Sequence, residues 1–187
     1  MQKYKGLFIA LGIVLLLVFA YVYYYNGFIA LEEEVNGKWA EIENNLQRRA
    51  DLIPNLVATV KGYARHEEEI FTEIAQARSR LLGAQGVADT VEASSAMESA
   101  LGRLLAIAEA YPELKADRSF LALQDELAGT ENRLSVARLR YNEAVKTYNT
   151  RIRRLPARIV AGMMGLEAKE YFQIEEAARA VPKVDFE

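Results

Sequence analysis

WAEIENNLQRRADLIPNLVATVKGY, residues 39–63, decides the fold because its apolar residues recur in steps of three and four. Such spacing places them on one face of a helix, as in a heptad repeat. The polar run LQRRADLIPNL at 46–56 lies within this pattern and leaves its phase unchanged. We therefore expect one amphipathic helix here, with an arginine at a buried position. The predicted seam comprises Trp39, Ile42, Leu46, Arg49, Ile53, Leu56, Val60 and Tyr63.

The same spacing continues to Leu81, and two further seams run through 97–111 and 120–155. Glycine and proline lie between the seams and favour turns there. Each apolar face is buried only if the others cover it. The sequence therefore predicts an all-α fold, an antiparallel bundle of three long helices and one short C-terminal helix. The predicted helices cover residues 28–82, 91–111, 118–155 and 167–181.

Pro54 lies inside the first predicted helix. Proline lacks a backbone donor and kinks or breaks a helix. Two alternatives follow: the helix continues with a kink at Pro54, or the chain reverses at 50–54 into a hairpin. The apolar phase is kept across Pro54, and no glycine lies between residues 38 and 61. These two features favour the kinked helix.

An uncharged stretch, GLFIALGIVLLLVFAYVYYY, occupies residues 6–25. At about 1.5 Å per residue it matches the roughly 30 Å hydrocarbon core of a bilayer. A cleaved signal peptide is disfavoured because bulky residues follow Ala20. We predict a short N-terminus at 1–5, a transmembrane helix at 6–25 and a bundle domain at 27–187. Tyrosines suited to the headgroup level end the stretch: Tyr21, Tyr23, Tyr24 and Tyr25.

Flanking charge predicts the orientation of this helix. Lys3 and Lys5 precede it, whereas the first cation after it is Lys38. The positive-inside rule therefore places residues 1–5 in the cytoplasm and the bundle domain outside it. That side is the periplasm where the cell has an outer membrane.

Composition excludes several classes of function. The chain has 187 residues, no cysteine and a formal net charge of −3. Disulfides and thiolate chemistry are excluded, and the charge gives no basis for binding nucleic acid. We expect no nucleic-acid partner.

Patterns typical of catalysis are also missing from the sequence. The sole histidine, His66, lies in RHEEEI, where Ile70 stands in place of the second histidine of a zinc HExxH motif. Tyr63 occupies the position that a di-iron Glu-x-x-His pair would need. No phosphate-binding or dinucleotide glycine pattern is present. We predict that the protein is not an enzyme and uses no cofactor.

Unusual polarity marks two of the predicted helices. Burying the Arg49 guanidinium is costly unless a carboxylate meets it. We hypothesise that Arg49 and Glu131 form a polar layer that fixes the register of the bundle. The alternative is that these charges are solvated or contact a second chain. The candidate residues are Arg48, Arg49, Asp51 and Asn55 on the first helix, and Glu131, Asn132 and Arg133 on the third.

Two further features lie near the C-terminus. A repeated YN pair at 141–142 and 148–149 predicts buried tyrosines with their hydroxyls at the rim of the core, in preference to a ligand site. ARIVAGMMG at 157–165 is apolar and contains methionines, which suits an adaptable partner contact. A loop that covers the end of the bundle is the alternative. Its candidate contact residues are Ile159, Val160, Met163 and Met164.

Long motifs in the chain resemble the LemA family of bacterial membrane proteins. They are EIENNLQRRADLIPNLVATVKGYARHE at 41–67, ALGRLLAIAEAYPELKAD at 100–117 and TENRLSVARLRYNEAVKTYNTRIRRLPARIVAGMMG at 130–165, with YN at 25–26 and PKVDF at 182–186. The resemblance implies an N-terminal transmembrane helix, a helical bundle and no known enzymatic activity. Genes of this family often lie near those of membrane proteases or other envelope proteins.

These features predict a single-pass protein of the bacterial inner membrane that contacts the lipid bilayer. We expect it to act as an interaction or scaffold module of the envelope and to form a homo-oligomer. Its further partner would be an envelope membrane protein or a protease. The alternative is a sensor or regulator that responds to a ligand or a protease partner.

Overall fold

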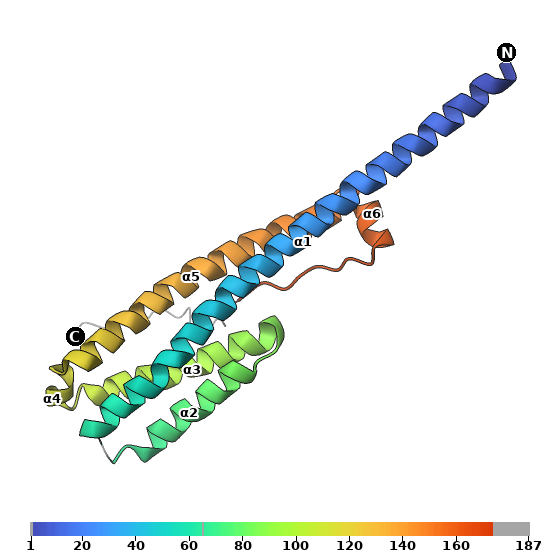
Figure 1. Cartoon of the computed structure of the whole chain (residues 1–187). Coiled ribbons are helices and arrows are strands. Elements are labelled where there is room, and N and C mark those ends of the chain that lie inside the picture. Colours follow the sequence, from blue (N-terminus) through green and yellow to red (C-terminus); the bar gives the residue numbers. More distant parts are fainter. Residues whose placement is uncertain (1, 65, 174–187) are drawn as a thin grey trace, which may run out of the picture. The chain divides into compact units, whose positions relative to one another are not determined.

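The computed structural model describes residues 2–64 and 66–173. All regular structure in these residues is α-helical, which confirms the predicted fold class (Figure 1). The helices are α1 (Gln2–Tyr63), α2 (Glu68–Gly83), α3 (Gly86–Ala108), α4 (Pro112–Lys115), α5 (Arg118–Arg153) and α6 (Ala157–Met163).

The chain forms two compact units. Within the described residues, unit 1 comprises the chain up to Ala40 together with Arg140–Glu170, and unit 2 comprises Glu41–Leu139 and the chain from Tyr171. Helices α1 and α5 contribute residues to both units.

The core of unit 2 is built from the predicted seams. On α1, Ile42, Ile53 and Leu56 are almost wholly buried, and Arg49 is buried with them. Tyr63, at the end of this seam, is partly exposed. Buried side chains from the other helices of this unit complete the core, among them Ile74, Met97, Leu104, Leu114, Phe120 and Leu134. The predicted spacing therefore matches the buried faces of α1, α2, α3 and α5 within unit 2, whereas Leu155 at the end of the third predicted seam is exposed.

α1 continues without interruption through Pro54, so the chain does not reverse at 50–54. A proline at this position removes the donor that would bond the carbonyl of Ala50, four residues earlier. Arg78 of α2 donates from its Nε atom to that carbonyl at 2.9 Å. The backbone group that Pro54 leaves unpaired is thus satisfied by another helix.

The first helix ends at Tyr63, so the prediction that it continues to residue 82 is wrong. Ala64 still donates to the carbonyl of Val60 at 2.9 Å, and α2 begins at Glu68. Gly62 weakens the end of α1, and Glu68 and Glu69 favour a new N-terminus because they complement the helix dipole. The seam keeps its phase across the break, which explains why periodicity did not reveal it.

Other boundaries also differ from the predictions. α3 begins at Gly86, where a positive φ of 77° suits glycine, and not at residue 91. α5 ends at Arg153, close to the predicted residue 155. The short helices α4 and α6 were not predicted.

The predicted helix at 167–181 is absent from its described part, because residues 166–173 have no helical structure. Gly165 has a φ of 68°, and the N–H of Leu166 bonds back to the carbonyl of Ala161 at 3.0 Å. This left-handed glycine ends the helical turn after α6. Residues 174–181 of the prediction lie outside the described residues.

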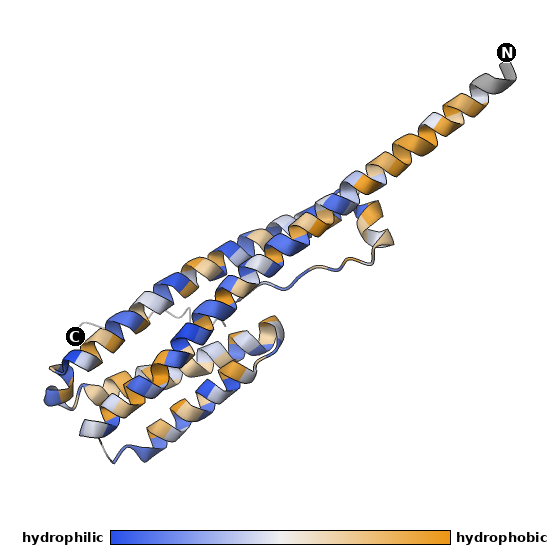
Figure 2. Cartoon of the chain, viewed as in Figure 1, coloured by the Kyte–Doolittle hydropathy of each residue, from blue (hydrophilic) through white to orange (hydrophobic). Residues whose placement is uncertain are grey.

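Apolar residues make up most of the N-terminal part of α1 (Figure 2), and its large apolar side chains are exposed. Its most apolar 18-residue window has a mean hydropathy of 2.6 and no buried residues. This window is therefore not a core helix of the described structure. By length and composition, α1 can cross a membrane once. Tyr21 and Tyr25 stack with ring centroids 6.1 Å apart, while their place at the headgroups stays a prediction.

Candidate functional site

The strongest candidate site in unit 2 is a buried group of charged and polar side chains, here called the arginine cluster: Arg49, Ser94, Glu131 and Arg138. Arg49 forms a direct ion pair with Glu131. Arg138 lies 3.5 Å from the other carboxylate oxygen of Glu131, and its Nη2 atom donates to Ser94 Oγ at 2.8 Å. Helices α1, α3 and α5 meet through these contacts.

Positive charge exceeds negative charge within the cluster. Two guanidinium groups, each with a side chain about 10% exposed, share one carboxylate whose side chain is 33% exposed. Burial lowers the pKa of Arg138, the carboxylates of Glu131 and Glu98 oppose this, and Arg49 reinforces it. Arginine keeps its proton in proteins, so the cluster retains two cations.

An aromatic ring partly compensates for this charge. The Arg138 guanidinium lies 4.8 Å from the ring centroid of Phe172, a favourable cation–π distance. Among the described residues, only the Nε atoms of Arg49 and Arg138 are buried side-chain polar atoms without a hydrogen-bond partner. Glu131 is therefore the main group that compensates for the buried charges of Arg49 and Arg138.

The structure brings together Arg49 and Glu131, the pair hypothesised from the sequence, while their role in register stays a prediction. Arg48 is exposed and lies 3.5 Å from Glu126 of α5. Asp51 accepts a hydrogen bond from Gln47 at 2.9 Å. These two positions therefore belong to the surface of unit 2.

The remaining candidates of this set, Asn55, Asn132 and Arg133, are also exposed. The sequence interpretation missed Ser94 and Arg138. Arg138 follows Glu131 by seven residues and therefore shares its helical face, a signal that could have identified it. Ser94 carries no comparable signal, because only the fold brings α3 to this point.

A different polar arrangement in unit 1, here called the YN clamp, comprises Tyr141, Tyr148 and Asn149. It holds the extended segment 166–170, which we call the strap. The Asn149 amide donates to the carbonyl of Lys169 at 2.9 Å, and the N–H of Lys169 donates to Asn149 Oδ1 at 2.8 Å. The Tyr141 hydroxyl donates to the carbonyl of Glu170 at 3.0 Å.

The side chain of Lys169 adds a charged contact to the strap. Its ammonium lies 2.8 Å from Glu32 Oε1 and 5.4 Å from the ring centroid of Tyr148. Tyr141 and Tyr148 are buried, and burial raises the pKa of both phenols. The ring of Trp39 lies 5.3 Å from that of Tyr141. The YN repeat thus supplies buried tyrosines and, through Asn149, a main-chain contact that the sequence did not reveal.

The ARIVAGMMG stretch forms α6 and the turn after it, so it is not only a loop. α6 buries Ala157, Val160 and Ala161. Ile159 and Met163 are exposed, and Met164 is partly exposed. Contact of these residues with a partner stays a prediction.

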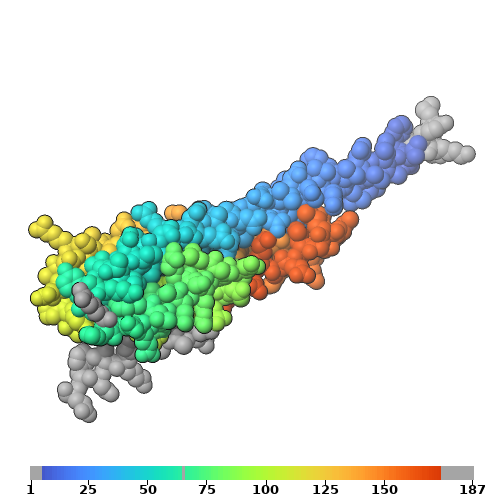
Figure 3. Space-filling view, turned by 60° about the horizontal axis from the view of Figure 1, so that its bottom comes forward, coloured from blue at the N-terminus to red at the C-terminus, as the bar shows by residue number. Residues whose placement is uncertain are grey.

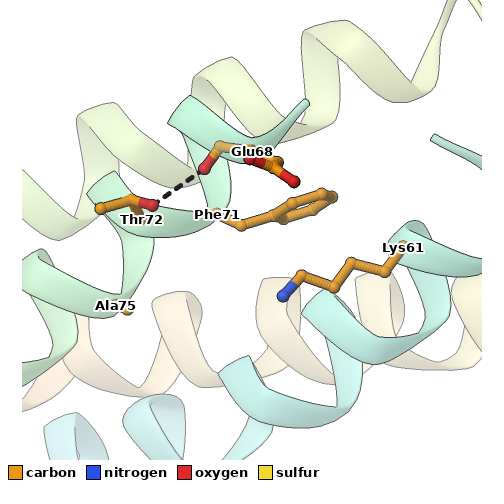
Figure 4. Close-up of a pocket in the computed structure, with 5 residues that line it drawn as sticks. All are labelled: Lys61, Glu68, Phe71, Thr72 and Ala75. Carbon is orange, nitrogen blue, oxygen red and sulfur yellow. Dashed lines mark hydrogen bonds between the residues drawn. The ribbon is translucent and has the colours of Figure 1, made fainter. Parts of the chain in front are cut away.

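A surface pocket in unit 2 lies where α1 ends and α2 begins (Figure 4). The Lys61 ammonium is 5.0 Å from the ring centroid of Phe71, and Thr72 donates to the carbonyl of Glu68 at 2.9 Å. Residues 2–64 and 66–173 contain no group of three or more His, Asp or Glu side chains placed to hold a metal ion.

These features define a membrane-associated, all-helical protein whose buried polar groups serve contacts within the fold. The model of the LemA family matches residues 38–186. The chain therefore belongs to the LemA family.

Curated relatives agree with this assignment. The chain is 28% identical over 179 residues to magnetosome protein MamQ 2 of Paramagnetospirillum magneticum, an alignment that covers 82% of the chain and 66% of the relative. It is 27% identical to magnetosome protein MamQ of Magnetospirillum gryphiswaldense, with the same coverage. It is 26% identical over 162 residues to protein LemA of Metamycoplasma hominis, covering 86% of the chain and 74% of the relative. Neither the family name nor these names denote an enzyme.

Proposed function

We propose that this protein is a non-enzymatic scaffold of the bacterial envelope, anchored by α1, which associates with further copies of itself through its helical domain. The observation that carries the proposal is an exposed apolar pair on α5. Leu139 is 60% exposed and Val136 is 47% exposed, three residues apart on one helix face. The same helix buries Arg138. Two large apolar side chains exposed together on one helix face offer a contact surface to another protein.

Native mass spectrometry of the full chain in mild detergent tests this proposal. The wild type is expected to form a homo-oligomer, and the Val136→Glu, Leu139→Glu double variant to shift it toward monomer. Gln76→Glu with Ser79→Glu is the matched control, because both positions are exposed and three residues apart on α2. A wild type that is monomeric at every concentration, or an oligomer that resists the double variant, contradicts the proposal.

A second candidate is a sensor or regulator that binds an envelope membrane protein or a protease. The strap favours it, because side chains of α5 hold the main chain of Lys169 and Glu170. Such bonds accept any extended peptide of matching backbone geometry. A monomer that co-purifies with a membrane protease in fixed ratio would support this candidate over the scaffold.

We further propose that the protein resides in the inner membrane with residues 1–5 in the cytoplasm and the bundle domain outside it. Lys3 and Lys5 support this orientation. The positive charges of Arg151 and the arginines that follow it favour the opposite orientation. They lie at the other end of the span, because Arg151 contacts Tyr24 near the end of the apolar stretch. A reporter fused after Glu187 that is active only outside the cytoplasm tests the orientation. Activity of the complementary cytoplasmic reporter would reverse it.

A further inference from the structure

A second concentration of positive charge lies where α5 ends and α6 begins, in unit 1. We call residues 151–163 the basic turn. Between residues 144 and 166 the chain carries five cations and no acidic residue, although its net charge is −3. They are Lys146, Arg151, Arg153, Arg154 and Arg158. The dipole of α5 accounts for cations in its last turn, but not for Arg154 and Arg158 beyond its end.

The basic turn also exposes large apolar side chains. Leu155 is 75% exposed, Ile159 61% and Met163 71%. Interfacial segments combine cations with exposed apolar residues, because the cations meet lipid headgroups while the apolar residues enter the acyl boundary. This combination suits a lipid surface better than it suits water.

Contacts within unit 1 place the basic turn beside the apolar stretch of α1. The Arg151 guanidinium lies 5.4 Å from the ring centroid of Tyr24, next to the end of that stretch. Trp39 contacts Tyr141 further along the same pair of helices. The two helices are therefore antiparallel in unit 1, and residues after Arg151 lie toward the membrane span.

The views of unit 1 agree with this arrangement. Figures 1 and 3 show α6 against α1, at the point where the bare N-terminal part of α1 begins. Headgroup layers are only about 5–7 Å thick on each side of the hydrocarbon core. Because Arg151 contacts Tyr24, one of the tyrosines predicted at the headgroup level, residues one helical turn beyond Arg151 lie level with the other tyrosines of that cluster, within the headgroup layer.

A surface groove between α1 and α5 lies at the same level. Gly27 and Leu31 line it from α1, and Gly27 follows the last tyrosine of the apolar stretch by two residues. The α5 side is lined by Glu143, Lys146, Thr147, Thr150, Arg151 and Arg154. Three cations face one carboxylate there, and cations are the usual ligands of phosphate oxygens. The Thr147 hydroxyl already donates to the carbonyl of Glu143 at 2.9 Å, so the cations carry the binding.

We propose that the groove and the basic turn bind the phosphate headgroups of anionic phospholipids in the bilayer that α1 crosses. Leu155, Ile159 and Met163 then enter the boundary between headgroups and acyl chains. This contact holds the end of α5 against the membrane and makes the protein sensitive to lipid composition. The inference goes beyond the scaffold proposal and rests on membrane anchoring by α1 alone.

Because the natural chain has no cysteine, a single introduced cysteine can carry an environment-sensitive dye. The full-length Leu155→Cys variant is labelled and reconstituted in vesicles of phosphatidylcholine, with or without an equal part of phosphatidylglycerol. Phosphatidylglycerol is expected to shift the emission of the dye to the blue. Nitroxide lipids labelled just below the headgroup are expected to quench it. Labelled Leu121→Cys, at an exposed position of α5 in unit 2, is the control and should not respond.

Charge variants test the role of the arginines. The triple variant Arg153→Gln, Arg154→Gln, Arg158→Gln in the labelled chain is expected to raise the phosphatidylglycerol fraction needed for the blue shift. Each arginine near an anionic surface contributes roughly a five-fold factor in binding. The matched control replaces three exposed arginines of unit 2 by glutamine: Arg80, Arg118 and Arg133. Lysine at 153, 154 and 158 should restore the response.

The proposal is overturned if emission at position 155 is the same in both vesicle types, or if the triple variant responds like the wild type. It is also overturned if inorganic phosphate produces the same shift in phosphatidylcholine vesicles. Unchanged circular dichroism of the triple variant establishes that it folds. The oligomeric state of the triple variant should match that of the wild type. Failure of the lipid proposal therefore leaves the scaffold proposal intact, and failure of the scaffold proposal leaves the lipid proposal intact.

Discussion

The arginine cluster of unit 2 joins charged side chains to one another, whereas the YN clamp of unit 1 uses neutral side chains that bond the main chain. Arg49, Glu131 and Arg138 join helices whose backbone bonds are already made within each helix. Asn149 and Tyr141 bond the main chain of Lys169 and Glu170, in the strap, which is not helical. The first arrangement specifies how helices align, and the second gives a non-helical segment the bonds it lacks.

Glu131→Gln is expected to have the largest effect, because it leaves two buried arginines without their carboxylate. Removing one partner of a buried ion pair destabilises by about 3 kcal/mol, at the lower end of the usual range since Glu131 is a third exposed. Denaturant unfolding of the full chain in mild detergent measures the loss. Glu126→Gln is the control, because its pair with Arg48 is about half exposed on both sides, and should cost less than about 1 kcal/mol. Equal losses for the two variants would contradict a special role for the cluster.

Asn149→Ala is expected to free the strap without unfolding the helices. Two hydrogen bonds to Lys169 are lost, a local cost of about 2 kcal/mol, or roughly 30-fold faster amide exchange at 166–170. Hydrogen exchange with mass spectrometry measures this directly. Asn132→Ala, at an exposed position of α5, is the matched control. If exchange accelerates equally throughout unit 1, the clamp supports the whole unit and not the strap alone.

Arg49→Leu tests whether the cluster sets register. Leucine at position 49 removes one of the two cations that share Glu131. Glu131 keeps Arg138 at 3.5 Å, so the carboxylate is not left unpaired and we expect a change below about 1 kcal/mol. A register role predicts a broader unfolding transition at a similar midpoint, because alternative alignments of α1 become accessible. A variant of equal or higher stability with an equally sharp transition would show that Arg49 does not set register.

Asp117→Asn is expected to have the smallest effect and to depend on pH. Asp117 accepts the N–H of Phe120 at 2.9 Å and the hydroxyl of Tyr63 at 3.1 Å. The bond from Phe120 lowers its pKa below the usual 3.8, burial opposes this, and Tyr63 and Ser119 reinforce it. The charge therefore stabilises the fold above the unfolded-state pKa, and this contribution is lost as pH falls through the folded-state pKa.

The difference in melting temperature between wild type and Asp117→Asn should accordingly be present at about pH 6 and shrink below about pH 4. Because asparagine also caps helices, the comparison isolates the charge. A difference that is independent of pH would show that the carboxylate charge is not the cause.

Periodicity predicted the core because burial repeats along a helix. Ile42, Leu56 and Leu134 could be identified as buried from their spacing alone. Arg49 and Glu131 were identified as partners because a buried guanidinium needs a carboxylate. The end of α1 at Tyr63 was missed because the seam keeps its phase, although Gly62 and the following glutamates mark a boundary.

Contacts made by main-chain atoms were beyond prediction from the sequence. The strap bonds through the N–H and carbonyl groups of Lys169, which every residue but proline carries. Its side chains therefore give no sign that Asn149 holds it. Ser94 was missed for a related reason, since its bond to Arg138 exists only after α3 and α5 pack together.

Pro54 helps to attach α2 to α1 because it has no backbone N–H. The carbonyl of Ala50 therefore has no donor within α1, and Arg78 donates to it at 2.9 Å. No substitution at position 50 other than one that distorts the backbone can remove this acceptor, so position 54 encodes it. Any other residue at position 54 would supply a backbone N–H that competes with Arg78 for the carbonyl of Ala50. A residue usually described as a helix breaker thus specifies, within an intact helix, where a neighbouring helix attaches.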